Sequence, residues 1–262
     1  MKNIDTLTIT QLLQNPTGRF SAYMARRDRI IDDMDNRYRK LLTICKKFNF
    51  KIYKVKKDYL FHFEIPSEEF PNNLLYNVCI LFCVYDEVAK DKTINNYTLK
   101  LFSNSPNFMF TYTYALEQND MIIPFLKSKC SHLALTQPPS VRNPIEVYGF
   151  EKSVYFACKY IMDNNLNHIF DIDNNRRIYN QTKFKTEVMS QEMKYEENKK
   201  IKKQISDEKK KAKQALKSKT ASDMTDTKKF KSKTTTVSKT NSLKKNTTKK
   251  TGAINVIKRK KK

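Results

Sequence analysis

The sequence predicts an α+β fold: a small antiparallel sheet packed with helices, then a charged helix and a disordered basic tail. Three observations predict it. Apolar residues recur at three- and four-residue spacings early in the chain, and they alternate with a period of two from residue 50 to 65. Near the C-terminus, lysine, serine and threonine replace most apolar residues. We therefore expect an α+β domain at residues 1–180, a charged solvent-exposed helix at 181–217 and a disordered lysine-rich tail at 218–262.

The N-terminal part of the chain is expected to be helical. Residues 10–15 form a short helical piece that a proline ends. Residues 20–48 form a long amphipathic helix with charged residues between its apolar positions. The apolar positions that recur at helical spacing are Ile30, Met34, Tyr38, Leu41, Cys45 and Phe48.

Four strands are expected next. Residues 50–65 form a hairpin with its turn at Lys-Lys-Asp, and Phe50 and Ile52 share one face of its first strand. Residues 76–87 are continuously apolar and fit a central strand, although periodicity alone does not distinguish such a strand from a buried helix. Residues 97–103 alternate as a fourth strand, which completes an antiparallel sheet with short connections.

Helices are expected again after residue 103. Pro106 and Pro124 each fit the first turn of a helix, where the missing N–H would have no helical partner. Residues 150–165 form a helix, and from residue 183 to 217 charges stand at helical spacing. The residues after 217 cannot bury enough apolar surface to offset the entropy of ordering them.

Composition excludes common nucleotide-binding enzymes, and it shows that most of the positive charge lies near the C-terminus. Only 3 of the 262 residues are glycine, so no glycine-rich loop that cradles phosphates is possible. The formal net charge is +24, and residues 199–262 carry +20 of it, with 24 Lys/Arg and four acids. A nearly neutral body is therefore joined to a polycationic region.

The polycationic region is the expected site of nucleic-acid binding. A flexible polycation neutralises phosphates and releases counterions, which gives salt-sensitive binding without sequence specificity. Its lysines favour loose contacts over the bidentate recognition that arginine provides. A solubilising tail or a tail for an acidic protein is the alternative, and in a eukaryotic host the terminal KRKKK fits a nuclear import signal. The candidate residues are Lys209, Lys210, Lys211, Lys213, Lys228, Lys229, Lys231, Lys244, Lys245, Lys249, Lys250, Lys258, Arg259, Lys260, Lys261 and Lys262.

Cysteine usage and the N-terminus indicate a protein made in a reducing compartment. The five cysteines are scattered, odd in number and mostly within apolar runs, which is typical of buried free thiols. We expect no signal peptide, because no apolar stretch follows the first lysine, and no membrane span.

Several motifs resemble sites but fail a requirement. The sequence DIDNNRR at 171–177 begins like a calcium loop, but Arg176 replaces the glycine of the turn and Thr182 the bidentate glutamate, so a turn or a helix cap is favoured. Glu146 and Glu151 read as a loop leading into a helix rather than an acid–base pair.

The pairs of cysteine and histidine residues are also weak candidates for a functional site. The pairs Cys79/Cys83 and Cys130/His132 lack the second ligand pair that zinc requires. A nucleophile pair of Cys130 with His62 or His168 stays open, although any chain with five cysteines and three histidines offers such pairs. We expect no metal, no cofactor and no enzymatic activity.

The aromatic stretch SNSPNFMFTYTYAL at 103–116 has two interpretations. Its aromatic rings are of the kind that stacks on bases in nucleic-acid sites. On a helix, however, Phe108 and Tyr112 share one face while Phe110 and Tyr114 lie on another, and aromatic residues on several sides indicate burial. Packing in the core is therefore favoured.

The segments FEIPSE, YNVCILF, YTLKLFSNSPNFMFTYTYAL and PPSVRNPIEVYGFEKSVYFACKYI together resemble a family of structural proteins of tailed bacteriophages with AT-rich genomes. The resemblance covers about residues 50–165. It implies a non-enzymatic virion or morphogenesis protein, with the head or the head–tail junction as its expected place. Such a protein oligomerises, contacts other virion proteins, and is made in the host cytoplasm. The alternative is a nucleic-acid-binding or processing protein whose globular body provides specificity.

Overall fold

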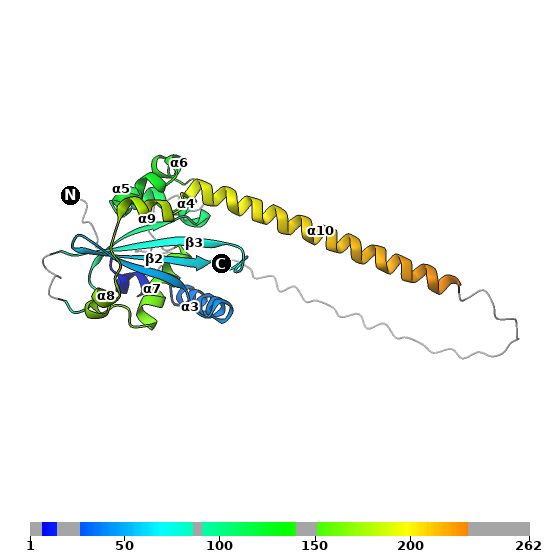
Figure 1. Ribbon diagram of the computed structural model, residues 1–262, viewed down its shortest axis with the longest axis horizontal. Coiled ribbons are helices and arrows are strands. Elements are labelled where there is room, and N and C mark those ends of the chain that lie inside the picture. Colours follow the sequence, from blue (N-terminus) through cyan, green and yellow to red (C-terminus); the bar gives the residue numbers. More distant parts are fainter. Residues whose placement is uncertain (1–6, 15–26, 86–90, 140–150, 230–262) are drawn as a thin grey trace, which may run out of the picture. The chain divides into compact units, whose positions relative to one another are not determined.

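The computed structural model describes the backbone of residues 7–14, 27–85, 91–139 and 151–229, and it confirms the α+β fold (Figure 1). The chain divides into two compact units, residues 1–208 and 209–262. The first unit contains the sheet, and the second begins within the last helix.

The sheet has four antiparallel strands in the order β1-β2-β3-β4. The strands are β1 (Asn49–Val55), β2 (Asp58–Pro66), β3 (Leu75–Cys83) and β4 (Thr98–Ser103). Val55 pairs with Asp58 across the first hairpin, so the loop has two residues. Lys56 adopts the left-handed conformation there, with φ of 58°, which a tight hairpin turn requires although no Asn-Gly is present.

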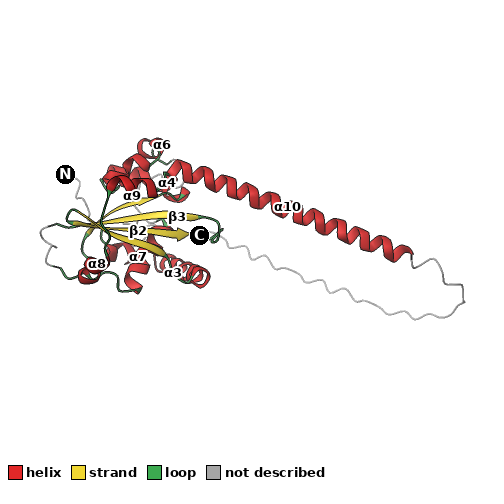
Figure 2. Ribbon diagram, viewed as in Figure 1, coloured by secondary structure: helices red, strands yellow, loops and turns green. Residues whose placement is uncertain are grey.

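One face of the sheet packs on α1 (Ile9–Gln14), α3 (Arg27–Cys45), α7 (Lys152–Asp163) and α8 (Ile169–Asn175) (Figure 2). Phe61, Phe63 and Ile80 point into this layer and are fully buried. The period-two alternation of β1 and β2 places Phe50 and Ile52 on the same face, as expected.

The opposite face packs on α9 (Gln181–Glu187) and on the 3₁₀ helix η1 (Pro124–Lys129). Tyr53, Leu60 and Cys79 point to this side, and Phe184 and Val188 cover them. Because both faces are covered, β3 is apolar along nearly its whole length. This explains why the periodicity of its sequence could not distinguish a strand from a buried helix. The structure shows that it is a strand.

Short helices follow β4. They are α4 (Pro106–Thr111), α5 (Thr113–Gln118) and α6 (His132–Thr136). Ser105 caps α4, with its hydroxyl accepting from the Phe108 N–H, and Pro106 occupies the first turn, as expected. Beside β4, the Leu101 N–H donates to Met121 and the Ile123 N–H to the Leu101 carbonyl, so this edge of the sheet is covered.

The first long helix ends earlier in the structure than the sequence predicts. It ends at Cys45 rather than at residue 48, because Lys46 turns left-handed with φ of 62° and leads into β1. Residues 20–26 of the expected helix lie outside the described residues.

The expected charged helix is two helices, α9 and α10 (Gln191–Lys229). It is not solvent-exposed at its start, because Phe184, Val188 and Gln191 are buried. The first unit consequently extends to residue 208, so the expected boundary at residue 180 falls inside it. The expectation of disorder from residue 218 onward is wrong for residues 218–229, because their backbone is helical. Residues 230–262 lie outside the described part of the chain.

Candidate nucleic-acid interface and other candidate sites

The structure places four of the candidate lysines on α10. Lys209, Lys210, Lys211 and Lys213 are exposed in the first turns of the C-terminal unit. The backbone at positions 228 and 229 is helical, and the other ten candidates, from Lys231 to Lys262, lie outside the described residues. The helical backbone of Lys209 to Lys213 agrees with the charged helix expected at residues 181–217, whereas the helix at positions 228 and 229 replaces the expected disordered tail.

The first unit pairs many of its charges internally. The Lys51 ammonium lies 2.7 Å from Glu187, and the Lys100 ammonium 2.6 Å from Asp120. These pairs join distant segments and neutralise their own charge locally. By residue count, the net charge of residues 1–208 is +6, compared with +18 for residues 209–262.

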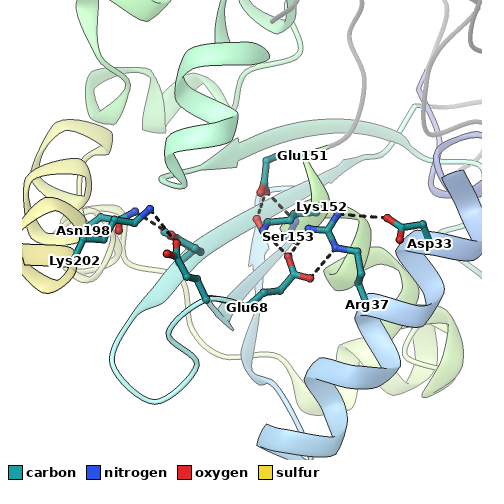
Figure 3. A network of polar contacts seen from close by, with 10 residues as sticks. Asp33, Arg37, Glu68, Glu151, Lys152, Ser153, Asn198 and Lys202 are labelled. Atoms are coloured by element: carbon teal, nitrogen blue, oxygen red, sulfur yellow. Dashed lines mark hydrogen bonds and ion pairs between the residues drawn. The ribbon is translucent and has the colours of Figure 1, made fainter. Parts of the chain in front are cut away.

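A polar network of the first unit centres on Glu68 (Figure 3). Arg37 of α3 donates to both carboxylate oxygens of Glu68, at 2.8 and 2.7 Å, and Lys152 of α7 pairs with the same group. Burial raises the pKa of Glu68, but the hydrogen bonds from Arg37 and Lys152 outweigh it and hold the pKa below its ordinary value. The network ties two helices to the segment after β2.

The first turns of α10 are attached to the same segment. The Asn198 amide donates to the Tyr76 hydroxyl at 3.2 Å, and the Lys202 ammonium lies 2.9 Å from Glu69 (Figure 3). Lys202 thus joins α10 to the segment after β2 through an ion pair. Its place in a polycationic run gives no reason to expect such a pair. Sequence reasoning could not identify it, because its partner lies 133 positions away in the printed sequence.

Gln191, the first residue of α10, is fully buried and joins three segments. Its Oε1 accepts from the Ser131 backbone N–H at 3.0 Å. Its Nε2 donates to the Ser103 carbonyl at 3.0 Å and to the Thr113 hydroxyl at 3.1 Å. This side chain fixes where α10 starts, and the sequence carries no local signal for it.

His62 belongs to a buried amide network rather than to a nucleophile pair. Asn77 Oδ1 accepts from Asn104 Nδ2 at 2.9 Å and from the Met189 N–H at 3.3 Å. The Asn77 Nδ2 group, 3.1 Å from His62 Nε2, is therefore the donor, which assigns the imidazole proton to Nδ1. Burial, followed by the charge of Lys51, lowers the pKa of His62 to about 4, so the ring is neutral.

Cys130 lacks the environment of a catalytic thiol. Burial raises its pKa to about 12, the opposite of the depression that activates a nucleophile. Burial also raises the pKa of Cys83 to about 11 and that of Cys79 well above its ordinary value. No group of three His, Cys, Asp or Glu side chains suited to a metal ion occurs among the described residues. The described residues also contain no helix long and apolar enough to cross a membrane.

The calcium-like stretch is helical, so the expectation of a turn or cap was wrong for most of it. Residues 169–175 form α8, which holds its alternating acidic positions in a helix instead of a loop. Asp173 instead accepts from the Tyr59 hydroxyl at 3.3 Å and lies 3.5 Å from the Lys54 ammonium. Glu151 caps α7 by accepting from the Ser153 N–H at 3.0 Å, and Glu146 lies outside the described residues.

The aromatic stretch is divided between core and surface. Phe108 is 1% exposed, which agrees with packing in the core, whereas Phe110 is 44% exposed. The Phe110 ring meets Tyr195 edge-on, with 5.1 Å between centroids. Phe110, Tyr114 and Leu133 line an open apolar hollow of about 410 Å³, and Leu133 is 61% exposed.

A second hollow, of about 400 Å³, lies at the start of β1 and carries mixed charge. Lys47, Lys51 and Arg177 contribute cations, Phe50 an aromatic surface, and Glu64 an acid. These residues come from segments more than 100 positions apart, and no local pattern in the sequence could have found them.

Comparison of the chain with known proteins identifies no relative. No protein-family model, no curated protein and no solved structure matches the chain. The functional argument therefore rests on the charge distribution and on the contacts of the described residues.

Proposed function

We propose that the protein is a non-enzymatic structural protein of a bacteriophage particle whose C-terminal region binds nucleic acid without sequence specificity. One observation carries the binding function. Residues 209–262 hold 20 Lys/Arg and two acids, a net charge of +18 on 54 residues, whereas residues 1–208 carry only +6. Such a region attracts phosphates and releases their counterions.

The boundary between the compact units supports this division of labour. The excess of Lys/Arg begins at residue 199, and all but +2 of the +20 that follows lies in the C-terminal unit, which starts at residue 209. Within residues 1–208, lysines such as Lys51 and Lys152 are paired with acids. The body is thus suited to protein contacts, and the C-terminal region to a polyanion.

The virion assignment rests on the resemblance of four segments to phage structural proteins. Three of them supply β2, β3, β4 and the buried helix α4, and part of the fourth supplies α7. These are elements of a core and carry no catalytic group, which supports a structural role. Mass spectrometry of purified particles from the source tests it: the protein should be a stoichiometric component, and its absence from particles would exclude the assignment.

Retention on immobilised DNA tests the binding function. The full chain should be retained at low salt and released as salt rises, and a chain ending at residue 208 should pass through. Equal retention of the shortened chain would contradict binding by the C-terminal region.

That contradictory result would favour the second candidate function, in which the body binds nucleic acid with specificity. The hollow at the start of β1 is the observation that favours it, since Lys47 and Arg177 flank the aromatic Phe50. Glu64 in the same hollow and the Lys51–Glu187 ion pair reduce its positive charge, which is why we place it second.

A further inference from the structure

The C-terminal unit begins with a helix, and the helix orders its lysines. Residues 209–229 belong to α10. Successive residues of an α-helix are rotated by about 100°. Positions 209, 210, 213 and 217, all lysine, therefore fall on one face, and position 228 returns to it.

The remainder of the helix differs from this face. Position 215, an alanine, and the acidic position 226 lie nearly opposite to it, whereas Ala212 and the acidic position 223 lie beside it, about 90–110° from its middle. Lys211 and positions 219 and 229, also lysine, lie away from the face, so the separation concerns five of the eight lysines. Lys209, Lys210 and Lys213, whose side chains are described, are exposed.

We propose that residues 209–229 bind duplex nucleic acid as a preformed helix, with the face of positions 209, 210, 213 and 217 against the phosphates. The proposal rests on the proposed function, because it specifies how the C-terminal region binds. It replaces a loose polycation by a defined surface for at least the first third of that region.

The dimensions of the helix suit a duplex. Twenty-one residues at a rise of about 1.5 Å give a length of roughly 30 Å, which corresponds to about nine base pairs. The lysines at 209, 210, 213 and 217 occupy about 12 Å of this length. A fixed row of this kind matches phosphates that a duplex holds at fixed positions, whereas a single strand adapts to any polycation. A helix formed before binding also avoids the entropy cost of ordering a disordered segment on the nucleic acid.

Other polyanionic surfaces fit less well. A helix that lies in a membrane interface has large apolar residues such as Trp, Phe or Leu opposite its lysines. Here the position opposite the lysines near the start of the unit is Ala215, and Ala212 lies to the side. The lysine face is therefore assigned to duplex nucleic acid, and anionic vesicles serve as a comparison.

The test breaks the helix without changing its charge. Ala212→Pro removes a helical N–H and clashes with the preceding turn, so it separates the first lysines of the face from the later ones. Thr240→Pro is the matched control beyond the helix. Both full-length variants are compared with the wild type for binding to a fluorescent 24-base-pair duplex, to one of its single strands, and to vesicles with phosphatidylserine.

If Ala212→Pro loses two phosphate contacts, the slope of log K against log salt should become shallower by about 1.8. Over a fourfold range of salt concentration, this slope change corresponds to roughly a tenfold change in relative affinity. Thr240→Pro should match the wild type. If the wild type binds the duplex and Ala212→Pro binds it equally well, the helical face is refuted while the proposed function stands. An equal loss on the single strand, or tighter binding to vesicles, would refute the duplex assignment. A wild type without salt-dependent binding would refute the proposed function itself.

Discussion

Replacing Gln191 by leucine tests whether the buried start of α10 is held as the structure indicates. The Gln191 side chain is fully buried and makes three hydrogen bonds of 3.0 to 3.1 Å. Leucine fills a similar volume, but it deprives the buried Ser131 N–H and the Ser103 carbonyl of this partner. Each such loss costs about 1–3 kcal/mol, so Gln191→Leu should lower the free energy of unfolding by roughly 3–5 kcal/mol.

Urea unfolding followed by tyrosine fluorescence and circular dichroism measures this change. Met193→Ala is the matched control two residues further on, because that side chain is 63% exposed, and it should change stability by less than about 0.5 kcal/mol. A Gln191→Leu variant within about 1 kcal/mol of the wild type would refute the hydrogen-bonding account of this junction.

Three further predictions concern the first unit. A chain ending at residue 180 should bind the dye ANS and unfold without a cooperative transition, since it loses Phe184 and Val188 from the cover of one sheet face, whereas a chain ending at residue 208 should unfold cooperatively. Glu68→Gln should cost about 1–2 kcal/mol in urea unfolding at pH 7. Because the folded pKa of Glu68 is lowered, the wild-type advantage is present above the ordinary pKa and should disappear as the pH falls through the folded value. At pH 8, iodoacetamide should modify Cys130 at least about tenfold more slowly in the folded than in the unfolded chain, because burial raises the pKa of its thiol. Comparable rates would contradict that shift.

Much of the sheet could be predicted because side-chain alternation depends on local sequence. The hairpin and the common face of Phe50 and Ile52 follow from a period of two, which only an extended backbone produces. β3 was ambiguous for a physical reason: burial on both faces removes the polar positions that would reveal the period.

The C-terminal boundary could not be predicted, because it depends on contacts between distant segments. Phe184 and Val188 are spaced too sparsely to indicate a buried helix by themselves, yet the sheet face formed by Tyr53 and Cys79 accepts them. Gln191 is an ordinary residue in a charged run until Ser131 and its other partners are placed around it. The candidate lysines, in contrast, were identifiable from composition alone, since net charge requires no fold.

The salt dependence of DNA binding by the full chain tests the central claim most directly. Anisotropy titrations of a duplex between 50 and 200 mM salt give the slope of log K against log salt for the full chain and for a chain ending at residue 208. If six to ten phosphates are neutralised, the slope for the full chain should lie between about −5 and −9, and the shortened chain should bind weakly with a slope near zero. Equal slopes for the two chains would contradict the claim that residues 209–262 carry the nucleic-acid interface.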